Sequence, residues 1–553
     1  MIKEEIIEAY ALKNAIEHDG KSQVGSVISG LFQEGLQKKD LKKIIGKVKE
    51  IIGKVNKLNL NEQEIKFKNF EDKVKKREEH SGLHDLPNVK GKVVMRFAPY
   101  PSGALHIGNA RTAILNDEYV KKYGGEQLLI IDDTIGSKEK EISKEAYKLI
   151  PEALEWLGIK YKKIFYKSDR LNLFYRYGKE LIKKGAAYVC FCKQADLRNN
   201  RKEGKECSCR KKELKIDLEH WKDMLNGKYK EGEAIVRLKT DMKDPDPAFR
   251  DRVLFKISDR KHPRTNKKYR VWPTLEMSWS IDDHELGMTH ILRGKELQIE
   301  GRVEKFIWKI FKWKPIELIY NGHLQLEGAK ISKSKSRKEV LSGKYSGWDD
   351  PRTFSLQSLK RRGIQPEAIR KFIISFGINP TEVHAPLENL YKENKKIIEK
   401  SNRFFFIQDP VKIKIKNAPH ALVKVPLHPD HVERGYRELK TTDEFYISKK
   451  DKIKIKKQAI RFMHHINFKN YEYLSKDYDP KLNALMLHWL PVSKDLVKVE
   501  ITMPDGSIEK GLGEPKLKEL KKDSIIQFER FGFVKLDSIN KKEKTYQFWF
   551  THH

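Results

Sequence analysis

Apolar residues recur at helical spacing through the first part of the chain. Val24, Ile28, Leu31 and Leu36 fall on one face of a helix with about 3.6 residues per turn. The motif IIGKV occurs twice within IIGKVKEIIGKVNKL, and we interpret this echo as helical amphipathicity because two copies cannot form a repeat array. We therefore predict a helical region over residues 1–85.

The next segment changes pattern and predicts a βαβ unit. Glycine, proline and charged residues between Glu78 and Lys92 are typical of a linker, which puts a domain boundary near residue 85. Beyond it the pattern predicts a strand, a helix and a second strand, at Val93–Phe97, Asn109–Lys122 and Gln127–Ile131. Two apolar strands joined by a helix require a parallel sheet, whose ligands bind beyond the carboxyl ends of the strands. The turn at 98–108 and Asp132-Asp133 are therefore the candidate site.

The rest of the chain predicts more helices, a second α/β stretch and a β-rich end. Helical patterns at Ser143–Leu157 and Leu171–Lys184 precede a cysteine-bearing insert and the strand-like AIVRLK, and the α/β pattern returns through Gly301. Residues from Pro366 to Phe406 are predicted to be helical. After Asp409-Pro410, apolar and polar residues alternate in VKIKIK, ALVKVPL, FYISKK, DKIKIKK, SIIQFERFGFVKLD and TYQFWF. These strands predict a β-barrel region with a basic exterior, although solubility alone also explains any single lysine there.

Length and charge narrow the class of protein. A chain of 553 residues is expected to hold about three to five domains. The excess of 113 Lys and Arg over 78 Asp and Glu, a net charge of +35, favours nucleic acid as a partner. A lysine-rich surface of ion pairs is the alternative. The N-terminus has no apolar signal segment and no apolar run approaches the roughly 18 residues of a membrane span, so we predict a cytoplasmic protein without membrane contact.

All four cysteines fall in one short segment. Cys190 and Cys192 form one C-x-C pair, and Cys207 and Cys209 form a second pair shortly after it. Four thiolates suit tetrahedral Zn²⁺, and a loop with so few apolar residues needs such a crosslink to hold its shape. A redox pair is less favoured because C-x-x-C is absent. We predict a structural Zn²⁺ site.

The turn after the first predicted strand carries glycines and a histidine, in PSGALHIGN from Pro101 to Asn109. Backbone N–H groups and the positive end of a helix dipole receive phosphate or carboxylate oxygens at such a turn. Gly103 and Gly108 lack a Cβ, which lets a base or a phosphate come close, and His106 can donate a hydrogen bond to a phosphoryl oxygen. Alone, the motif is short enough to recur by chance, and an isolated histidine is more often structural.

A second motif, KISKS, runs from Lys330 to Ser334 after the strand-like LIYNGHLQL. Two lysines with small polar residues between them suit a mobile loop that places ammonium groups against polyphosphate, although such a run in isolation is usually a solvated loop.

Together, HIGN and KISKS in this order resemble the class I aminoacyl-tRNA synthetases. RFAPYPSGALHIGNART, IIDDT, SIDDHELGMTHILRGKE and GWDDPRTFSLQSLKRRGI are similar to the glutamyl and glutaminyl subgroup. FFFIQDPVKI, VPLHPDHVERGYREL and QFERFGFVKLD resemble the anticodon-binding β-barrel of its archaeal glutamyl members.

The resemblance implies an α/β multidomain fold built around a Rossmann-type parallel sheet. Its expected parts are a helical N-terminal appendage (1–85), the first half of the catalytic domain (90–185), an acceptor-binding insertion with the zinc site and the return to the catalytic sheet (186–290), the second half with the KISKS loop (291–345), a helical connector (346–405) and the anticodon-binding β-barrel region (406–553).

The resemblance also implies a glutamate-tRNA ligase that uses ATP and Mg²⁺. L-Glutamate attacks the α-phosphorus of ATP to form glutamyl-adenylate, and the 3′ end of the glutamate tRNA then accepts the glutamyl group. No enzyme nucleophile is needed, so the protein supplies position and charge. Activation is expected to wait for tRNA. Glutamine tRNA stays open as a second acceptor, and the enzyme is expected to be a monomer.

Each site residue is carried over from the motif that contains it. His106, Lys330 and Lys333 are expected to be catalytic, by stabilising phosphoryl and pyrophosphate charge. ATP is expected to contact Pro99, Gly103, His106, Gly108, Asn109, Ile331, Ser332 and Lys333. Glutamate is expected to contact Arg96, Ser102, Asp132, Trp272 and Arg293, with Asp132 on the ammonium and the two arginines on the carboxylates. A surface ion pair with Glu296 is the alternative for Arg293.

Three positions depart from the usual pattern of the subgroup. Asn109 stands where histidine is usual and can still donate one hydrogen bond, Ile331 stands where methionine is common, and Trp272 stands where a tyrosine hydroxyl is common.

Two other functions stay open. A glutaminyl-tRNA synthetase is less favoured because the Arg293 guanidinium finds a partner only in a carboxylate. A tRNA-binding protein of the same fold without catalysis is less favoured because both motifs are intact.

Overall fold

The computed structural model describes residues 3–18, 20–34, 36, 40–70, 73–74, 83–135, 141–328, 333–456 and 458–553. The chain divides into two compact units, Met1–His80 and Ser81–His553. The first unit contains the helices α1 (Glu4–Glu17), α2 (Val24–Gln33), α3 (Leu41–Val55) and α4 (Leu60–Lys68). Leu12, Leu31 and Val48 are buried in its own core. The apolar spacing therefore predicted the helical character of this region correctly.

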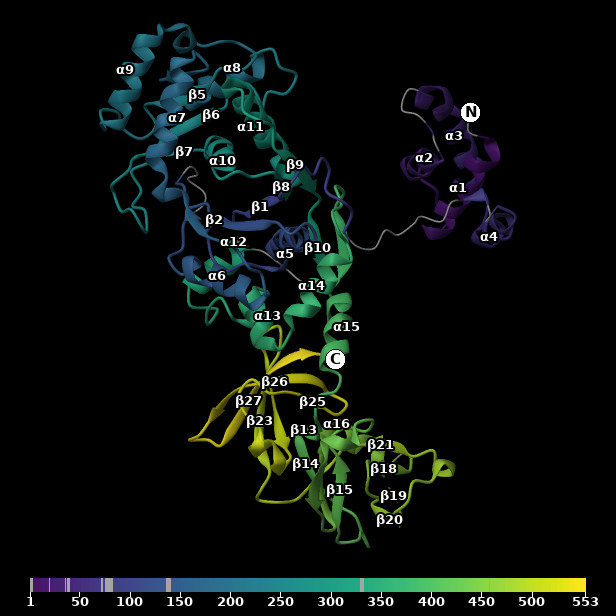
Figure 1. Ribbon diagram of the computed structural model, residues 1–553. Helices are drawn as coiled ribbons and strands as arrows, with labels where there is room; N and C mark the ends of the chain where they lie inside the picture. The colour runs from purple at the N-terminus through teal and green to yellow at the C-terminus, as the bar shows by residue number, and fades with distance from the viewer. Residues whose placement is uncertain are drawn as a thin grey trace. The chain divides into compact units, whose positions relative to one another are not determined.

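The second unit begins with a parallel sheet (Figure 1). Strands β1 (Val94–Phe97), β2 (Glu126–Ile131) and β3 (Ile164–Tyr166) pair in parallel in that order, and β8 (His290–Gly294) pairs in parallel with β9 (Glu317–Asn321). The backbone N of Thr289 donates to Val94 O over 2.9 Å, so β8 starts beside the start of β1. Helices α5 (Ile107–Lys122), α6 (Ala146–Trp156) and α11 (Gln298–Phe311) connect these strands. The carboxyl ends of β1, β2 and β3 meet at one edge.

An antiparallel sheet is inserted between β3 and β8. Its strands are β4 (Ala187–Cys190), β5 (Ile235–Leu238), β6 (Val253–Ile257) and β7 (Val271–Pro273), paired in chain order. Helices α7 (Leu171–Lys183), α8 (Gln194–Glu203), α9 (Leu214–Leu225) and α10 (Leu275–Glu285) accompany it. Phe174, Trp221, Phe255 and Trp272 are buried together in its core.

The segment after β9 differs from the prediction in two places. LIYNGHLQL, predicted as one strand, is divided between β9 and β10 (Leu324–Glu327). The stretch 366–406, predicted to be helical throughout, contains α14 (Pro366–Ile374) and α15 (Leu387–Ile398), but β11 (Val383–Pro386) lies between them and pairs in parallel with β10. Helical periodicity cannot reveal this strand, because its ladder partner lies far away along the chain. Helices α12 (Lys333–Leu341) and α13 (Leu356–Arg362) precede α14.

A seven-stranded sheet occupies much of the C-terminal part. Its order is β12-β25-β26-β27-β23-β24-β13, so its two edge strands are β12 (Arg403–Phe404) and β13 (Phe406–Gln408). The remaining strands are β23 (Val497–Thr502), β24 (Ile508–Gly513), β25 (Ile525–Phe528), β26 (Gly532–Asn540) and β27 (Thr545–His552). Only Phe405 separates the two edge strands along the chain, so the sheet curls until it is nearly closed.

Smaller sheets complete the C-terminal part. They comprise β14 (Pro410–Lys414), β17 (Glu444–Ser448) and β22 (Leu490–Pro491); β15 (Leu422–Pro426) and β16 (Tyr436–Lys440); and β18 (Ile460–Phe462), β19 (Asn467–Lys469), β20 (Glu472–Ser475) and β21 (Leu485–Leu487). The predicted strand DKIKIKK is wrong, because this segment forms helix α16 (Lys449–Ile455). The Ser448 side chain accepts a hydrogen bond from Asp451 N over 3.1 Å and starts the helix as its N-cap.

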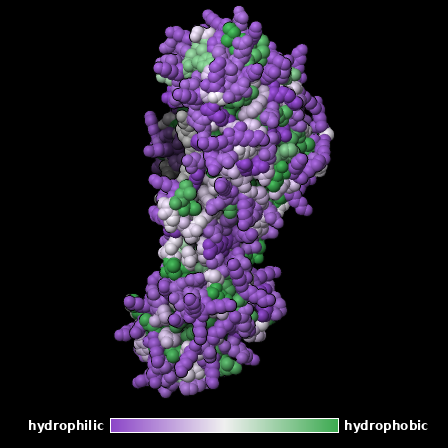
Figure 2. Space-filling view, turned by 90° about the vertical axis from the view of Figure 1, so that its left-hand side faces the viewer, coloured by the Kyte–Doolittle hydropathy of each residue, from purple (hydrophilic) through white to green (hydrophobic). Residues whose placement is uncertain are grey.

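The surface matches the charged composition. The face drawn in Figure 2 is mostly hydrophilic, with small separate groups of hydrophobic residues. Among the described residues, no helix has the length and apolar character needed to cross a membrane.

One buried arginine joins α13 to the C-terminal sheet, and its removal should weaken that junction. Arg362 donates to Phe550 O over 3.1 Å and to Thr551 O over 2.9 Å, and only 1% of it is exposed. Arg362→Met leaves buried carbonyl groups without their donors, which costs about 1–3 kcal/mol. We expect a lower midpoint of thermal unfolding. Lys360→Met, which removes an exposed charge from the same helix, is the control and should leave the midpoint nearly unchanged.

Candidate functional site

The turn between β1 and α5 places His106 at the start of the helix. Its Nδ1 accepts a hydrogen bond from Gly108 N over 3.1 Å, and its own backbone N donates to Asn109 Oδ1 over 3.3 Å. This capping box starts the helix at Ile107, two residues before the predicted start. Because Nδ1 accepts, the neutral ring carries its proton on Nε2, and Nε2 is therefore the donor of the imidazole.

Gly103 makes a close approach to another part of the chain. Its φ of +150° is a conformation that side chains rarely adopt, and a Cβ on it would lie 2.2 Å from the Trp348 ring. The close approach at Gly103 is therefore made by a tryptophan of the chain itself. At Gly108 a Cβ would lie 3.0 Å from the His106 ring, so that glycine leaves room for the cap.

The same turn is fastened to the end of β2. Asp132 N donates to Pro99 O over 3.1 Å, and Ser143 N donates to Pro101 O over 2.9 Å. Ser102 N closes a tight turn on Tyr100 O over 2.9 Å. The residues predicted on the turn and Asp132 are thereby held at the carboxyl edge of the parallel sheet.

Three cations converge on one indole ring at this edge. The guanidinium carbons of Arg96 and Arg293 lie 5.0 and 4.9 Å from the centre of the Trp279 ring, and Lys167 Nζ lies 5.0 Å from it. Arg96 comes from β1, Arg293 from β8, and Lys167 directly follows β3. Cations are attracted to the face of an indole, so Trp279 is a common platform for all three.

Each of these cations has an acidic partner. Arg96 donates two hydrogen bonds to the Asp283 carboxylate, and Lys167 Nζ lies 3.3 Å from Asp132 Oδ1 and donates to Ser278 Oγ over 2.7 Å. These groups are buried, and burial lowers the pKa of Lys167. The cluster is a nearly dry arrangement of opposite charges, which is costly unless each charge is paired.

Arg293 does not form the surface ion pair with Glu296. Its Nη1 and Nη2 donate to the two carboxylate oxygens of Glu304 on α11, each over 2.7 Å, and both side chains are buried. Its Nε is buried and has no hydrogen-bond partner among the described residues, and the same holds for Trp279 Nε1. The cluster therefore contains two buried N–H donors for which the described part of the chain supplies no acceptor.

Trp272 belongs to the inserted sheet rather than to the parallel sheet that carries Arg96 and Arg293. It is fully buried in the core of the inserted sheet, and its ring stacks on that of His262 with centroids 5.0 Å apart. Trp279 and Lys167, which the sequence reasoning missed, stand beside the two arginines instead. Only their positions along the chain pointed to them. Trp279 lies on α10, the helix that contains most of the SIDDHELG motif, and Lys167 directly follows β3.

The KISKS motif lies mostly outside the described residues. Lys330, Ile331 and Ser332 are not described, and Lys333 is described only as the first residue of α12.

The four cysteines form one cluster next to β4. Their Sγ atoms all lie within 4.8 Å of one another, and the Cys190 and Cys207 Sγ atoms are 3.9 Å apart. Four sulfurs at about 2.3 Å from a tetrahedral Zn²⁺ stand about 3.8 Å apart, so the donor set and its spacing fit this metal. The hydrogen bond with the Cys190 thiol lowers the pKa of Cys207 to about 4, and Arg237 Nη1 lies 3.6 Å from the same sulfur. These contacts therefore favour a thiolate at Cys207, whereas the same hydrogen bond raises the pKa of Cys190.

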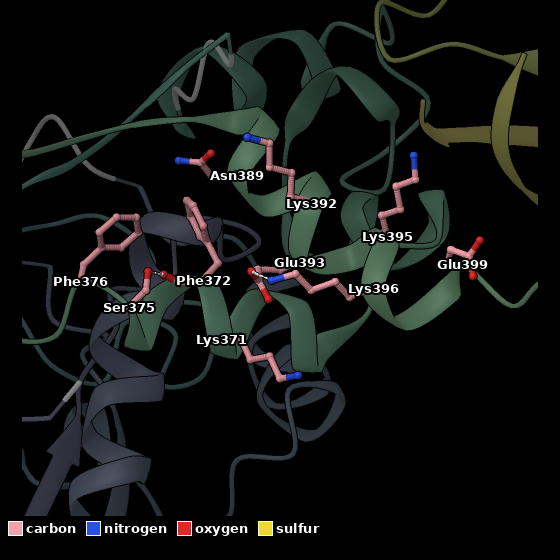
Figure 3. Close-up of a pocket in the computed structure, with 10 residues that line it drawn as sticks. All are labelled: Lys371, Phe372, Ser375, Phe376, Asn389, Lys392, Glu393, Lys395, Lys396 and Glu399. Atoms are coloured by element: carbon pink, nitrogen blue, oxygen red, sulfur yellow. Dashed lines mark hydrogen bonds and ion pairs between the residues drawn. The ribbon is translucent and has the colours of Figure 1, made fainter. Parts of the chain in front are cut away.

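A cavity of about 660 Å³ lies elsewhere, along α14 and α15. Figure 3 shows the side chains around it, which include four lysines, Lys371, Lys392, Lys395 and Lys396, and the rings of Phe372 and Phe376. None of the predicted site residues lines it.

Comparisons with known proteins match nearly the whole second unit. The family "tRNA synthetases class I (E and Q), catalytic domain" matches residues 92–400, and two anti-codon binding domain families of the same class match 401–489 and 463–537. "Glutamate--tRNA ligase" of Pyrococcus abyssi is 43% identical over 97% of each chain, and that of Methanocaldococcus jannaschii is 42% identical over 97% of each. A glutamate-tRNA synthetase structure from Elizabethkingia anophelis, at 20% identity and a TM-score of 0.41, covers 56% of this chain and 72% of that chain.

The Arg293 pair generates a stability prediction. Arg293→Met leaves the buried Glu304 carboxylate without its cation, which costs about 3–5 kcal/mol. We expect a marked drop in the midpoint of thermal unfolding, and we expect the double variant Arg293→Met, Glu304→Met to regain most of it because no charge is left unpaired. Equal midpoints for the single and double variants would contradict this assignment.

Proposed function

The chain belongs to the class I tRNA synthetases of the glutamate and glutamine group, and we propose that it is a glutamate-tRNA ligase that activates L-glutamate with ATP and transfers it to tRNA. The family predicted from the sequence is confirmed. The predicted activity agrees with that of relatives that match 97% of the chain. A glutaminyl-tRNA synthetase and a tRNA-binding protein without catalysis are not favoured.

The observation that carries this proposal is the pair of unpartnered donors in the cation cluster. Glutamate brings two carboxylates and one ammonium, and Arg293 Nε and Trp279 Nε1 are buried donors of this cluster that no described residue satisfies. Glu304 holds the other end of the Arg293 guanidinium, so Nε is presented in a fixed direction. We assign Arg96, Ser102, Asp132 and Arg293 to glutamate, and we propose Trp279 at the place expected for Trp272.

The α5 turn is the proposed site for ATP. Backbone N–H groups at the helix start and the His106 Nε2 donor suit phosphate oxygens. We assign Pro99, Gly103, His106, Gly108 and Asn109 to the nucleotide, together with Lys330, Ile331, Ser332 and Lys333 of the KISKS motif. Lys330 and Lys333 supply charge against the triphosphate, and Mg²⁺ bound to the phosphates supplies more.

The C-terminal sheets are proposed to bind the tRNA anticodon, because two anti-codon binding families match there. We divide the chain as predicted, into 1–85, 90–185, 186–290, 291–345, 346–405 and 406–553, with the nearly closed sheet as the core of the β-barrel region. We propose a cytoplasmic monomer. Activation is proposed to require tRNA, and glutamine tRNA is a second candidate acceptor.

The cysteine cluster is proposed to hold one structural Zn²⁺ in the acceptor-binding insertion. Cys190, Cys192, Cys207 and Cys209 would bind it, and the metal would crosslink the two ends of α8.

Cys207→Ser should release the metal, because a hydroxyl is a much poorer zinc ligand than a thiolate. We expect about one zinc per chain in the unaltered protein and far less in the variant, measured by atomic emission on protein purified without chelator. Transfer to tRNA should fall more than ATP binding. A metal-free unaltered protein would contradict the assignment.

The activity itself is tested by aminoacylation. Purified glutamate and glutamine tRNAs are each offered with labelled glutamate or labelled glutamine. We expect glutamate on the glutamate tRNA and at least a 10²-fold preference over glutamine, because the relatives that match 97% of the chain are named glutamate--tRNA ligases. Charging with glutamine instead would overturn the proposed function, and the glutamine tRNA arm shows whether that tRNA is accepted.

A further inference from the structure

A loop of the inserted sheet reaches the end of β2. The β6–β7 loop, residues 258–270, folds back on itself where His262 and Asn266 exchange backbone hydrogen bonds of 2.9 Å, with φ +58° at Asn266. His262 is fully buried. The loop therefore inserts a side chain into the protein at its turn, while the residues on either side of it remain near the surface.

The His262 ring is held in one orientation. Its Nδ1 accepts from the backbone N of Arg264 over 3.2 Å and from that of Thr265 over 3.1 Å. The proton is therefore on Nε2, which donates to the carbonyl oxygen of Asp133 over 2.8 Å. The loop thus fixes the main chain directly after Asp132, the residue proposed to bind the glutamate ammonium.

The Asp133 side chain is fixed from the other side. Its carboxylate accepts from Ser168 N over 2.8 Å, from Ser168 Oγ over 2.7 Å and from Tyr147 OH over 2.9 Å. Its main chain is tied to the inserted sheet, and its side chain is tied to β3 and α6. Asp132 cannot shift far without breaking one of these two sets of contacts.

Arg264 gives the loop a second anchor. Its Nη1 donates to Ser168 Oγ over 2.6 Å, its Nη2 pairs with Asp169 Oδ2 over 2.9 Å, and its guanidinium lies 3.9 Å from the centre of the Tyr166 ring. Through Arg264 and His262 the loop spans the carboxyl ends of β2 and β3. A displacement of the loop would therefore be felt at both strand ends.

The outer side of this loop is basic. Its segment RKHPRTNKK contains no acid, and Lys261 and Lys267 are exposed. Exposed lysines on a loop suit a polyanion, and the proposed function supplies one in the acceptor end of tRNA. The loop thus has a buried end at Asp133 and a charged end open to a nucleic-acid backbone.

We propose that the β6–β7 loop is a coupling element, in which His262 positions Asp132 for the glutamate ammonium and the exposed lysines tie that position to tRNA. The inference rests on the proposed function and deepens it. If tRNA binds one position of the loop more tightly, it also favours the position of Asp132 that goes with it. Linkage then requires that glutamate raise the affinity for tRNA by the same factor as tRNA raises the affinity for glutamate. His262 acts through Asp133, so it is a positioning residue.

The first experiment separates positioning from simple stability. His262→Ala removes the donor to Asp133, and we expect the KM for glutamate to rise about tenfold, the value of one buried hydrogen bond, while the KM for ATP changes less than twofold. His262→Gln, whose amide can donate to the same carbonyl, should restore most of the affinity. Pyrophosphate exchange in the presence of tRNA measures each constant.

The control is another buried histidine with the same kind of bond. His488 donates from Nε2 to Phe406 O over 2.8 Å in the C-terminal part. His488→Ala should lower the midpoint of thermal unfolding and leave the KM for glutamate unchanged. If His262→Ala behaved like His488→Ala, or if it changed the KM values for ATP and glutamate equally, the positioning role would be overturned.

The second experiment tests the link to tRNA. In the unaltered protein the KM for glutamate is measured at low and at saturating tRNA, and we expect tRNA to lower it. The double variant Lys261→Ala, Lys267→Ala should raise the KM for tRNA and shrink its effect on glutamate at least threefold. Lys148→Ala, Lys160→Ala, two exposed lysines outside the loop, is the matched control.

The outcomes distinguish this inference from the proposed function. An unaltered protein that charges glutamate, with the same tRNA effect in both double variants, would overturn the coupling and leave the function intact. An unaltered protein that charges no glutamate would overturn both.

Discussion

The fold of the candidate site depends on the cost of burying charge. At the carboxyl edge of the parallel sheet, Arg96, Lys167 and Arg293 are almost completely removed from water, and each is balanced by an acid of another element. These acids come from α10, α11 and the end of β2, so each ion pair joins two different elements of the fold. A buried pair adds little stability by itself, but losing one partner is severe. The positions of α10 and α11 against the sheet are therefore constrained by charge as well as by apolar packing.

The same constraint explains how the site can be selective. A guanidinium that is free to rotate would adapt to many ligands, whereas Glu304 holds Arg293 by two of its nitrogens and leaves Nε without a partner among the residues that the structure describes. Preorganised donors lose little entropy when a carboxylate binds. The acids near the arginines thus do not compete with the ligand for all of their hydrogen bonds. They determine which hydrogen bonds are left for it.

Local patterns predicted the parts of this arrangement that depend on neighbouring residues. The βαβ unit follows from two apolar strands and a helix, and its helix starts two residues early only because His106 and Asn109 form a capping box. Other features could not be predicted from the periodicity of apolar and charged residues alone. The alternation in DKIKIKK is equally compatible with a strand, and the Ser448 cap decides for a helix. The partner of Arg293 lies on the following helix, eleven positions away, where charge alone gives no reason to choose Glu304 over the nearer Glu296. Trp272 and Trp279 are alike in the sequence, and only packing separates a core residue from a cation platform.

The inserted sheet relates the proposed coupling to the charge balance of the site. Its four strands are paired in chain order, with the cysteine cluster next to β4 at one edge and the β6–β7 loop joining the two strands on the opposite side. A hydrogen-bonded sheet is stiff compared with the loops at its ends. If the whole sheet shifted, the displacement would therefore act mainly on the elements that its loops contact. One such meeting point is the His262 bond to Asp133, directly beside the acid that pairs with Lys167. The position of the inserted sheet therefore affects the charge balance of the site. A displacement of Asp132 would also leave Lys167 without its carboxylate.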